Sequence, residues 1–325
     1  MALFGNDKNV KTDVLYDIAV IGAGPAGLTA VIYALRDNKN VILFEKEEVG
    51  GQALNSNKIV NIPGFSEVNG YDFIEKVVKQ INSIETGSLS FVEEEVVNAL
   101  GDYSQKTPVF DIITNDRSYK ARSVIIATGS KYRTLGVLGE EDLIGRGISF
   151  CSTCDAPFYK GKEVVVIGGG NSAVTEAIEL SRFASQVFIL QNLEELTAQK
   201  GLIEELNKIE NIRVVTGVKI LGFFKDKDNR IIVDYETYMA ADYGWIARYK
   251  KVDGVFLAIG MEPQNEAFKN LAWINDNGYI KDTFGLVKAV GDCKEKDVRQ
   301  IATACGDGAE AAVNLCKDLN RLDEI

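Results

Sequence analysis

Two cysteines separated by two residues are the most reactive feature of the sequence. Cys151 and Cys154 enclose a serine and a threonine, and the carboxylate of Asp155 follows directly. Such a pair can cycle between dithiol and disulfide, because the second thiol lies close enough to resolve a mixed disulfide formed by the first. Half of a zinc site is the alternative, but structural zinc needs four ligands, and the chain has no histidine and no second cysteine pair. We therefore expect redox chemistry here and no metal.

Elements that would position this pair flank it on both sides. The first is the glycine turn Gly22-Ala23-Gly24-Pro25-Ala26-Gly27, which follows an apolar run at Tyr16–Ile21 that is typical of a buried parallel strand. An amphipathic helix is expected after the turn, and a second strand, Val41–Phe44, ends at Glu45. This pattern predicts a βαβ unit that binds a dinucleotide.

Each residue of the first turn has a mechanical role in such a unit. Gly22 allows the tight turn, Gly24 lets a pyrophosphate approach the backbone, and Gly27 lets helix and strand pack closely. The N-terminus of the helix favours the phosphates, and Glu45 can accept hydrogen bonds from ribose hydroxyls. A glycine turn that serves packing alone is the alternative.

The same unit recurs on the other side of the cysteines. Gly168, Gly170 and Ala173 repeat the spacing of the first turn, between apolar runs at Val164–Ile167 and Val187–Gln191. Two such units predict an α/β protein with two Rossmann-like dinucleotide-binding domains, the second inserted into the first.

Composition and charge exclude several classes of partner. The 36 Lys+Arg and 47 Asp+Glu residues give a net charge of −11, which argues against nucleic acid and against a membrane surface. No apolar run approaches the roughly 18 residues of a membrane span, and Met1–Lys11 has no signal-peptide core. Five cysteines without a leader indicate reduced thiols, so we expect a cytoplasmic protein.

Together with further motifs, these features resemble the low-molecular-weight flavin thioredoxin reductases. The resemblance covers nearly the whole chain. It implies an FAD-binding domain in two parts, 1–134 and 261–325, around an inserted domain at 135–260 that carries the CxxC. It also implies a homodimer that reduces thioredoxin. The further motifs are Gly50-Gly51-Gln52, Asn61-Ile62-Pro63-Gly64, Ile126-Ala127-Thr128-Gly129, Gly145-Arg146-Gly147, Ala258-Ile259-Gly260, Gly291-Asp292 and Arg299-Gln300.

The resemblance also assigns roles to single residues. Asp292 would hold the ribitol of FAD, and the start of the last helix, expected near Gly308, would lie by the flavin ring. Cys154 would face the flavin, Cys151 would attack the substrate disulfide, and Asp155 would shuttle a proton unless it serves only as a helix N-cap. The implied FAD-binding residues are Gly22, Gly24, Pro25, Ala26, Gly27, Glu45, Gly51, Gln52, Asn61, Thr128, Gly129, Gly291, Asp292, Arg299, Gln300 and Ile301.

The sequence departs from most of that family after the second unit. NADPH-dependent members carry a His-Arg-Arg cluster and a further arginine there, whereas this chain has Gln191–Thr197 with two carboxylates and no arginine. The segment from Tyr279 to Gly291 is also shorter. Because it lacks the pyridine-nucleotide contacts, the chain looks like the ferredoxin-dependent branch, so we expect ferredoxin as the donor, with NADH and then NADPH as alternatives. Docking patches for acidic ferredoxin would be Arg248-Tyr249-Lys250-Lys251 or Lys131-Tyr132-Arg133, unless these are simply solvated faces.

Two functions of other classes remain as alternatives. The chain could be a flavin-bound redox sensor or binding module whose dithiol changes its shape without turnover. A ferredoxin–NADP⁺ oxidoreductase of related fold is the other, although that type has no need of the cysteine pair.

Overall fold

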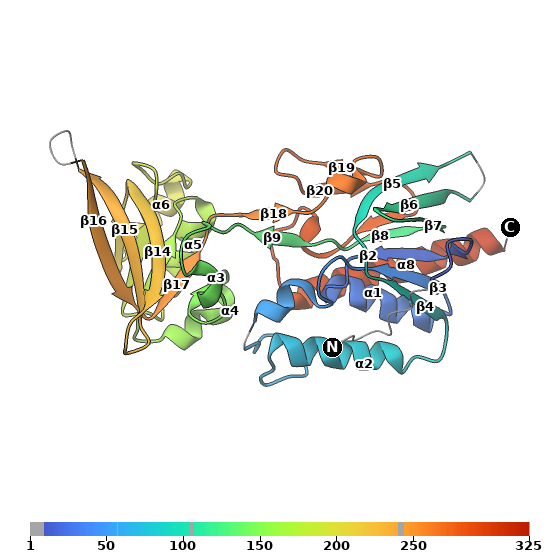
Figure 1. The fold of residues 1–325 in the computed structure, drawn as a ribbon, viewed down its shortest axis with the longest axis horizontal. Coiled ribbons are helices and arrows are strands. Elements are labelled where there is room, and N and C mark those ends of the chain that lie inside the picture. Colours follow the sequence, from blue (N-terminus) through green and yellow to red (C-terminus); the bar gives the residue numbers. More distant parts are fainter. Residues whose placement is uncertain (1–9, 57, 105–106, 240–243, 325) are drawn as a thin grey trace. The chain divides into compact units, whose positions relative to one another are not determined.

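A computed structural model describes residues 10–56, 58–104, 107–239 and 244–324 (Figure 1). The chain divides into two compact units, one formed by Met1–Lys131 with Glu262–Ile325 and the other by Tyr132–Met261. Each unit is described by itself.

The first unit is built on a five-stranded parallel sheet in the order β21-β8-β2-β3-β4. All four residues of β2 are buried, as expected for a strand at the centre of a parallel sheet. The bounds are β21 (Val287–Ala289), β8 (Val124–Ile126), β2 (Ile18–Ile21), β3 (Asn40–Phe44) and β4 (Ser88–Val92).

Helices and a second sheet enclose this parallel sheet. Figure 1 shows α1 and α2 on one side of it and β5–β7 on the other, and α8 packs along α1. The helices are α1 (Pro25–Arg36), α2 (Gly70–Asn82) and α8 (Ile301–Asp323), with 3₁₀ turns η1 (Gly51–Asn55), η3 (Glu266–Phe268) and η4 (Gly291–Cys293). The second sheet has the order β1 (Leu15–Tyr16), β7 (Ser118–Ala121), β6 (Val109–Thr114) and β5 (Val96–Asp102), and β19 (Ala272–Ile274) pairs with β20 (Ile280–Thr283).

The second unit repeats this layered plan. Its parallel sheet has the order β10-β17-β11-β12-β13, and one apolar core lies between this sheet and α5. A second core lies between the sheet and an antiparallel sheet, β14-β15-β16. The strands are β10 (Ile148–Ser149), β17 (Gly254–Leu257), β11 (Glu163–Ile167), β12 (Gln186–Leu190), β13 (Ile212–Val215), β14 (Val218–Lys225), β15 (Ile231–Met239) and β16 (Gly244–Val252).

Short helices complete the second unit, and two strands lie where the chain passes from one unit to the other. The helices are α3 (Glu140–Leu143), α4 (Ser152–Asp155), α5 (Asn171–Ser181) and α6 (Lys200–Leu206), with the 3₁₀ turn η2 (Ala156–Tyr159). The connecting strands β9 (Ser130–Tyr132) and β18 (Met261–Pro263) pair with each other. Within the described ranges, no helix is long and apolar enough to cross a membrane.

The two predicted βαβ units are therefore β2-α1-β3 and β11-α5-β12. In α1 the predicted apolar face is buried, and so is the corresponding face of α5. The predicted fold class, an α/β protein with two dinucleotide-binding folds, is confirmed.

Candidate functional site

Packing alone requires glycine at two positions of the first turn. Gly22 has φ +107°, and a Cβ there would lie 2.3 Å from the carbonyl oxygen of Ala127. A Cβ at Gly27 would lie 1.9 Å from the carbonyl oxygen of Gly22. Larger residues at either position would push α1 away from the end of β2, because backbone atoms cannot move aside as a flexible side chain can.

Gly24 differs, because nothing in the described chain requires glycine there. Its φ is −75°, which any residue adopts, and a Cβ would meet no atom within 4 Å. Gly24 is the N-cap of α1, so its open side faces the unpaired N–H groups of the first helical turn. Open space at this position is what an approaching pyrophosphate needs.

Glu45 is anchored beside the same turn. One carboxylate oxygen accepts a hydrogen bond from the Ala23 N–H at 2.8 Å, and the other accepts from Lys46 N–H at 2.8 Å and Glu47 N–H at 3.0 Å. The side chain is half-buried at the end of β3. Its position is therefore fixed while part of the carboxylate stays accessible.

Further predicted residues lie in or beside this turn. A Cβ at Gly51 would lie 3.5 Å from the Cα of Gly24, and a Cβ at Gly291 would lie 3.0 Å from the Cβ of Ala26. The structure thus brings η1 and η4, which are far apart in sequence, to the start of α1. Pro25 occupies the first turn of α1, where its missing N–H costs no hydrogen bond. Beside Gly51, the Gln52 side chain accepts a hydrogen bond from Asn55 at 2.9 Å.

Asp292 and Arg299 carry buried polar atoms without partners. Oδ1 of Asp292 and Nε of Arg299 are both buried, and neither has a hydrogen-bond partner within the described chain. Burial raises the pKa of Asp292, while Lys296 and Arg299 nearby oppose this shift. An unpartnered buried carboxylate oxygen is costly, so Oδ1 of Asp292 is available to accept from a donor such as a hydroxyl of a bound molecule.

Asp307 supports Asp292 and was not predicted from the sequence. Its Oδ2 accepts hydrogen bonds from the Gly291 N–H at 3.0 Å and from the Lys296 ammonium at 2.7 Å. These bonds fix the turn that presents Asp292. A contact across 16 residues that depends on how α8 packs gives no local sequence signal.

Asn265 supports Thr128 in a similar way. The Thr128 hydroxyl donates to Asn265 Oδ1 at 3.1 Å, and the Asn265 amide donates to the Cys293 and Gly278 carbonyl oxygens at 2.8 Å each. Asn265 is only 2% exposed. Gly129, next to Thr128, has φ +66°, a conformation that favours glycine.

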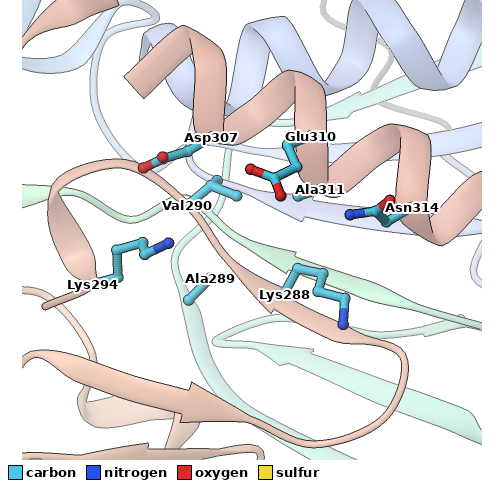
Figure 2. Close-up of a pocket in the computed structure, with 8 residues that line it drawn as sticks. All are labelled: Lys288, Ala289, Val290, Lys294, Asp307, Glu310, Ala311 and Asn314. Atoms are coloured by element: carbon cyan, nitrogen blue, oxygen red, sulfur yellow. The ribbon is translucent and has the colours of Figure 1, made fainter. Parts of the chain in front are cut away.

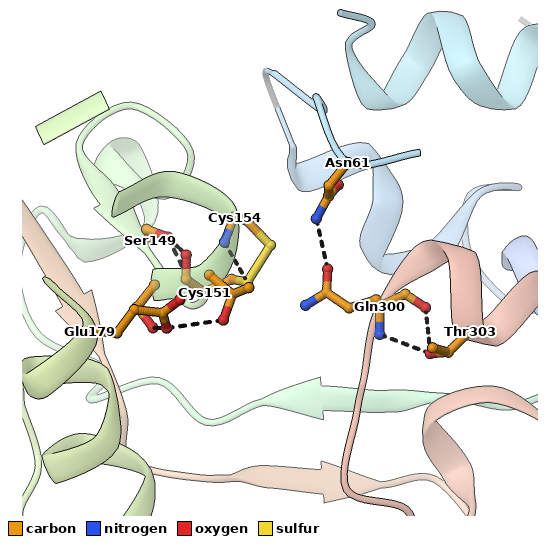
Figure 3. The surroundings of a disulfide bond; sticks show 9 residues. Asn61, Ser149, Cys151, Cys154, Glu179, Gln300 and Thr303 are labelled. Atoms are coloured by element: carbon orange, nitrogen blue, oxygen red, sulfur yellow. Dashed lines mark hydrogen bonds between the residues drawn. A yellow bond between two sulfur atoms is a disulfide. The ribbon is translucent and has the colours of Figure 1, made fainter. Parts of the chain in front are cut away.

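The last helix begins earlier than predicted. Gln300 is its N-cap, and a reciprocal capping box with Thr303 places the start at Ile301, so the prediction of a start near Gly308 is wrong. Gly308 lies within α8 instead, where a Cβ would be 2.1 Å from the Ala26 carbonyl oxygen. That glycine allows α8 to pack closely on α1. Asn61 Nδ2 donates to Gln300 Oε1 at 2.9 Å, which joins two predicted residues (Figure 3).

A polar pocket lies between β21 and α8, close to Gly291. Figure 2 shows two lysines beside β21 and two carboxylates on α8 facing it. No residue of this pocket was predicted as a site, and the charges of both signs give no clear preference for a ligand. Its lining is Lys288, Ala289, Val290, Lys294, Asp307, Glu310, Ala311 and Asn314.

The cysteine pair belongs to the second unit. Cys151 and Cys154 form a disulfide, with their Cα atoms 5.3 Å apart, across the single turn of α4. Cys151 is the N-cap of that turn, and its Sγ accepts from the Cys154 N–H at 3.2 Å. The hydroxyl of Ser149, at the end of β10, accepts from the Cys151 N–H at 3.1 Å.

Asp155 ends α4 next to the disulfide. Burial raises the pKa of Asp155, and a hydrogen bond with Ser149 opposes this effect. Its side chain makes no capping bond at the start of η2, so the alternative that it serves only as an N-cap finds no support. A carboxyl with a raised pKa beside two cysteines is suited to exchanging a proton with a thiol.

The second glycine turn is covered by its own chain. The Gln191 side chain follows β12 at the position that Glu45 has after β3, but it is only 4% exposed. A Cβ built at Gly169 would lie 2.4 Å from Cδ and Nε2 of Gln191. The Thr197 N–H then donates to the Gly169 carbonyl oxygen at 2.8 Å. The turn keeps the corner between strand and helix, while the segment after β12 folds across it.

Comparison with known proteins agrees with this arrangement. Residues 16–308 match the family described as pyridine nucleotide-disulphide oxidoreductase. The thioredoxin reductase of Bacillus subtilis is 35% identical over 324 residues, covering 97% of this chain and 98% of that protein. The chain belongs to the low-molecular-weight thioredoxin reductase family.

Two other relatives also match nearly the whole chain. A thioredoxin reductase structure from Streptococcus pyogenes is 33% identical, with a TM-score of 0.86 and coverage of 94% of this chain and 99% of that chain. A "34.2 kDa protein in rubredoxin operon" of Clostridium pasteurianum is 37% identical over 312 residues, covering 94% of this chain and 97% of that protein.

Membership in this thioredoxin reductase family makes the chain a flavoprotein disulfide reductase and implies FAD, the cofactor predicted from the sequence. The first unit fits FAD in two respects. Gly24 leaves space for a pyrophosphate at the start of α1, and Asp292 offers a buried, unpartnered acceptor. The residues that would hold FAD lie around these two points.

Proposed function

We propose that this protein reduces thioredoxin through FAD and the Cys151–Cys154 pair, and that its electrons come from ferredoxin. The observation that carries the choice of donor is the covered second glycine turn. Thioredoxin as substrate is proposed from the named relatives, together with the disulfide.

The two glycine turns of the chain differ in whether a side chain is available to accept hydrogen bonds from a ribose. Glu45 is half-buried and presents a carboxylate that can accept from ribose hydroxyls. Gln191 is buried instead, and its amide donates to the Glu195 carbonyl oxygen at 3.4 Å while its carbonyl accepts from the Asn192 N–H at 3.1 Å. A side chain that bonds to its own loop is not available to a ribose, so the second turn lacks the acceptor that the first one has.

The charges of the segment after β12 also disfavour binding of NADPH. The segment from Gln191 to Gln199 carries two glutamates and no lysine or arginine. A 2′-phosphate needs cationic, preferably bidentate, partners and would meet carboxylates here instead. This absence disfavours NADPH most strongly, while NADH, which has no 2′-phosphate, is the second candidate.

A protein donor that delivers single electrons would have no need of the second glycine turn.

The two predicted basic docking patches are largely ion-paired. Lys250 lies 3.9 Å from Glu163 and 3.7 Å from the ring centroid of Phe188, and Lys251 lies 3.2 Å from Asp226. Lys131 in the other patch pairs with Glu47. These contacts favour solvated, neutralised faces over a strong docking site, although Arg248 and Tyr249 remain exposed.

The chemistry follows from the residues around the disulfide. When bound and reduced by the donor, FAD would supply the two electrons that break the bond between Cys151 and Cys154. Asp155 would exchange the accompanying proton. Following the family assignment, the thiolate of Cys151 then attacks the disulfide of thioredoxin, and Cys154 resolves the mixed disulfide, so that thioredoxin leaves with two thiols.

Steady-state reduction of thioredoxin tests this function against a redox sensor. An enzyme consumes donor in proportion to time and reduces many equivalents of thioredoxin, whereas a sensor stops after one equivalent. The cytoplasmic location and the homodimer remain predictions.

A further inference from the structure

Glu179 contacts both residues that lie between the two cysteines, although it is 26 residues from Thr153 in the sequence. Ser152 Oγ donates to Glu179 Oε2 at 2.7 Å, and Thr153 Oγ1 donates to the same oxygen at 3.0 Å (Figure 3). Glu179 lies on α5, so these bonds tie the single turn of α4 to a longer helix of the same unit.

We propose that Glu179 is a positioning residue for the redox pair. It holds the α4 turn in place through the two hydroxyls, and its negative charge disfavours the thiolate form of the reduced cysteines. The clamp acts through the hydroxyls of Ser152 and Thr153, whereas the charge acts through space on the cysteine sulfurs.

The clamp supports a turn that is very short. Ser152 is 2% exposed, and Glu179 satisfies its buried hydroxyl. A helix of four residues is too short to hold its shape alone. Ser149 contacts the N–H and the carbonyl oxygen of Cys151, and the Asp155 N–H donates to the same carbonyl oxygen at 3.2 Å. Glu179 adds a tie from this turn to α5.

The charge of Glu179 already affects a neighbour one turn earlier on α5. The pKa of Glu176 is raised to about 8, by burial first and by the charge of Glu179 second. Oε2 of Glu176 is buried and has no hydrogen-bond partner in the described part of the chain. The negative charge of Glu179 therefore reaches a group beside it on the same helix.

Charged groups of both signs lie on the elements around the turn. Asp155 lies on α4 itself, and Tyr159 on η2 feels the charges of Asp155 and Asp253. The Lys162 ammonium lies over the ring of Tyr159, with Nζ 5.5 Å from its centroid, and Arg182 is the C-cap of α5. The measured effect of the carboxylate on α5 is therefore the difference that it makes against this background.

Reduction of the disulfide breaks the S–S bond and adds two electrons. Two protons enter if both sulfurs become thiols, and only one enters if one sulfur remains a thiolate. A fixed negative charge nearby favours the first outcome. The charge effect therefore appears only above the pKa of the more acidic thiol, whereas the effect of the clamp on the distance between sulfurs appears at every pH.

Two variants separate these effects. Glu179→Gln keeps an acceptor oxygen for both hydroxyls and removes the charge. The double variant Ser152→Ala/Thr153→Val removes the hydroxyls and keeps the charge. Glu210→Gln is the matched control, because it removes an exposed carboxylate next to β13, at the opposite edge of the sheet from β10.

The midpoint of the pair would be measured in the full-length flavoprotein against mixtures of reduced and oxidised dithiothreitol. Samples are quenched by alkylation, and the peptides that contain Cys151 and Cys154 are quantified by mass spectrometry. The pH dependence of alkylation gives the pKa of the reactive thiol, and midpoints are compared at one pH below and one above it. Flavin absorbance and circular dichroism confirm that each variant is folded.

We expect Glu179→Gln to lower the thiol pKa by about 0.5–1 unit. Above that pKa it should shift the equilibrium roughly three- to tenfold toward the reduced pair, where tenfold corresponds to about 30 mV. Below that pKa it should match the control. The double variant should destabilise the disulfide equally at both pH values, without a lower thiol pKa.

Three results would overturn the proposal. If Glu179→Gln behaved like Glu210→Gln at both pH values, the charge would have no role. An equal shift of the midpoint at both pH values in Glu179→Gln would mean that Glu179 has only a structural role. Wild-type midpoints in the double variant would show that the two hydroxyls do not hold the pair. The measurement uses neither ferredoxin nor a nicotinamide nucleotide nor thioredoxin, so its outcome is independent of the function proposed above.

Discussion

Gln191 lies across Gly169, whereas Glu45, at the equivalent position of the first unit, leaves its turn open. A Cβ at Gly169 would be 2.4 Å from the Gln191 amide. One chain thus contains two glycine turns of the same pattern, one open and one covered by the segment that follows β12. This difference underlies the proposed division between a unit that binds a dinucleotide and a unit that carries the dithiol.

The open turn gives the first prediction. Gly24→Val should yield folded protein with little FAD, because the site tolerates a side chain sterically but the side chain would fill the space that the pyrophosphate needs. Gly170→Val is the matched control, since the nearest atom to a Cβ there is Thr197 Oγ1 at 3.9 Å, in the covered turn. FAD content would be measured by absorbance after gel filtration. Full flavin in Gly24→Val, or equal loss in both variants, would contradict the assignment.

The second prediction concerns Asp292, which carries the unpartnered carboxylate oxygen. Asp292→Ala should weaken FAD binding by roughly ten- to a hundredfold, because a hydrogen bond to a charged group is worth about 1.5–3 kcal/mol. Asp282→Ala, at an exposed position of β20, is the control. Affinity would be measured by titrating FAD into apoprotein. Wild-type affinity in Asp292→Ala would exclude this residue from the site.

The third prediction concerns the two cysteines. Cys151→Ser should abolish thioredoxin reduction and leave a Cys154 thiolate, which can form a charge-transfer band with oxidised flavin. Cys154→Ser should instead trap a mixed disulfide between Cys151 and thioredoxin. Absorbance spectra and non-reducing gels would show these products. Turnover near the wild-type rate in either variant would rule out the dithiol relay.

Glu176 gives a prediction for pH and stability. Its pKa is about 8 in the folded chain against 4.5 for the free group, so the folded state binds more protons between these values. Stability therefore falls as pH rises from about 5 to 8, at about 1.4 kcal/mol per pH unit at most. Glu176→Gln should flatten this dependence. Urea unfolding at several pH values would test it, and parallel curves for both proteins would contradict it.

Much of this fold could be predicted because the signals are local. The glycine spacing and the apolar runs on either side of it define both βαβ units, and the apolar face of α1 follows from residues three and four apart. The CxxC pair was likewise visible, because its two cysteines are close in sequence and close in space.

What the sequence could not predict depends on distant packing. Glu179 contacts Thr153 across 26 residues, and Asp307 reaches Gly291 only because α8 lies beside η4. The start of α8 was misplaced near Gly308, whereas the structure begins the helix at Ile301 and uses Gly308 for close contact with α1. The conformation of Gln191 was also hidden, since its residue type alone does not show that it folds over Gly169.

The electron donor is the central claim, and anaerobic reduction of the bound flavin tests it most directly. The flavin absorbance would be followed after mixing with reduced ferredoxin, NADPH or NADH in parallel. Each lost charge-assisted contact to a 2′-phosphate is worth about 1.5–3 kcal/mol, so two or three missing contacts weaken NADPH by several orders of magnitude. We predict rapid reduction by ferredoxin and none by millimolar NADPH. Rapid reduction by micromolar NADPH, or by NADH alone, would contradict the account.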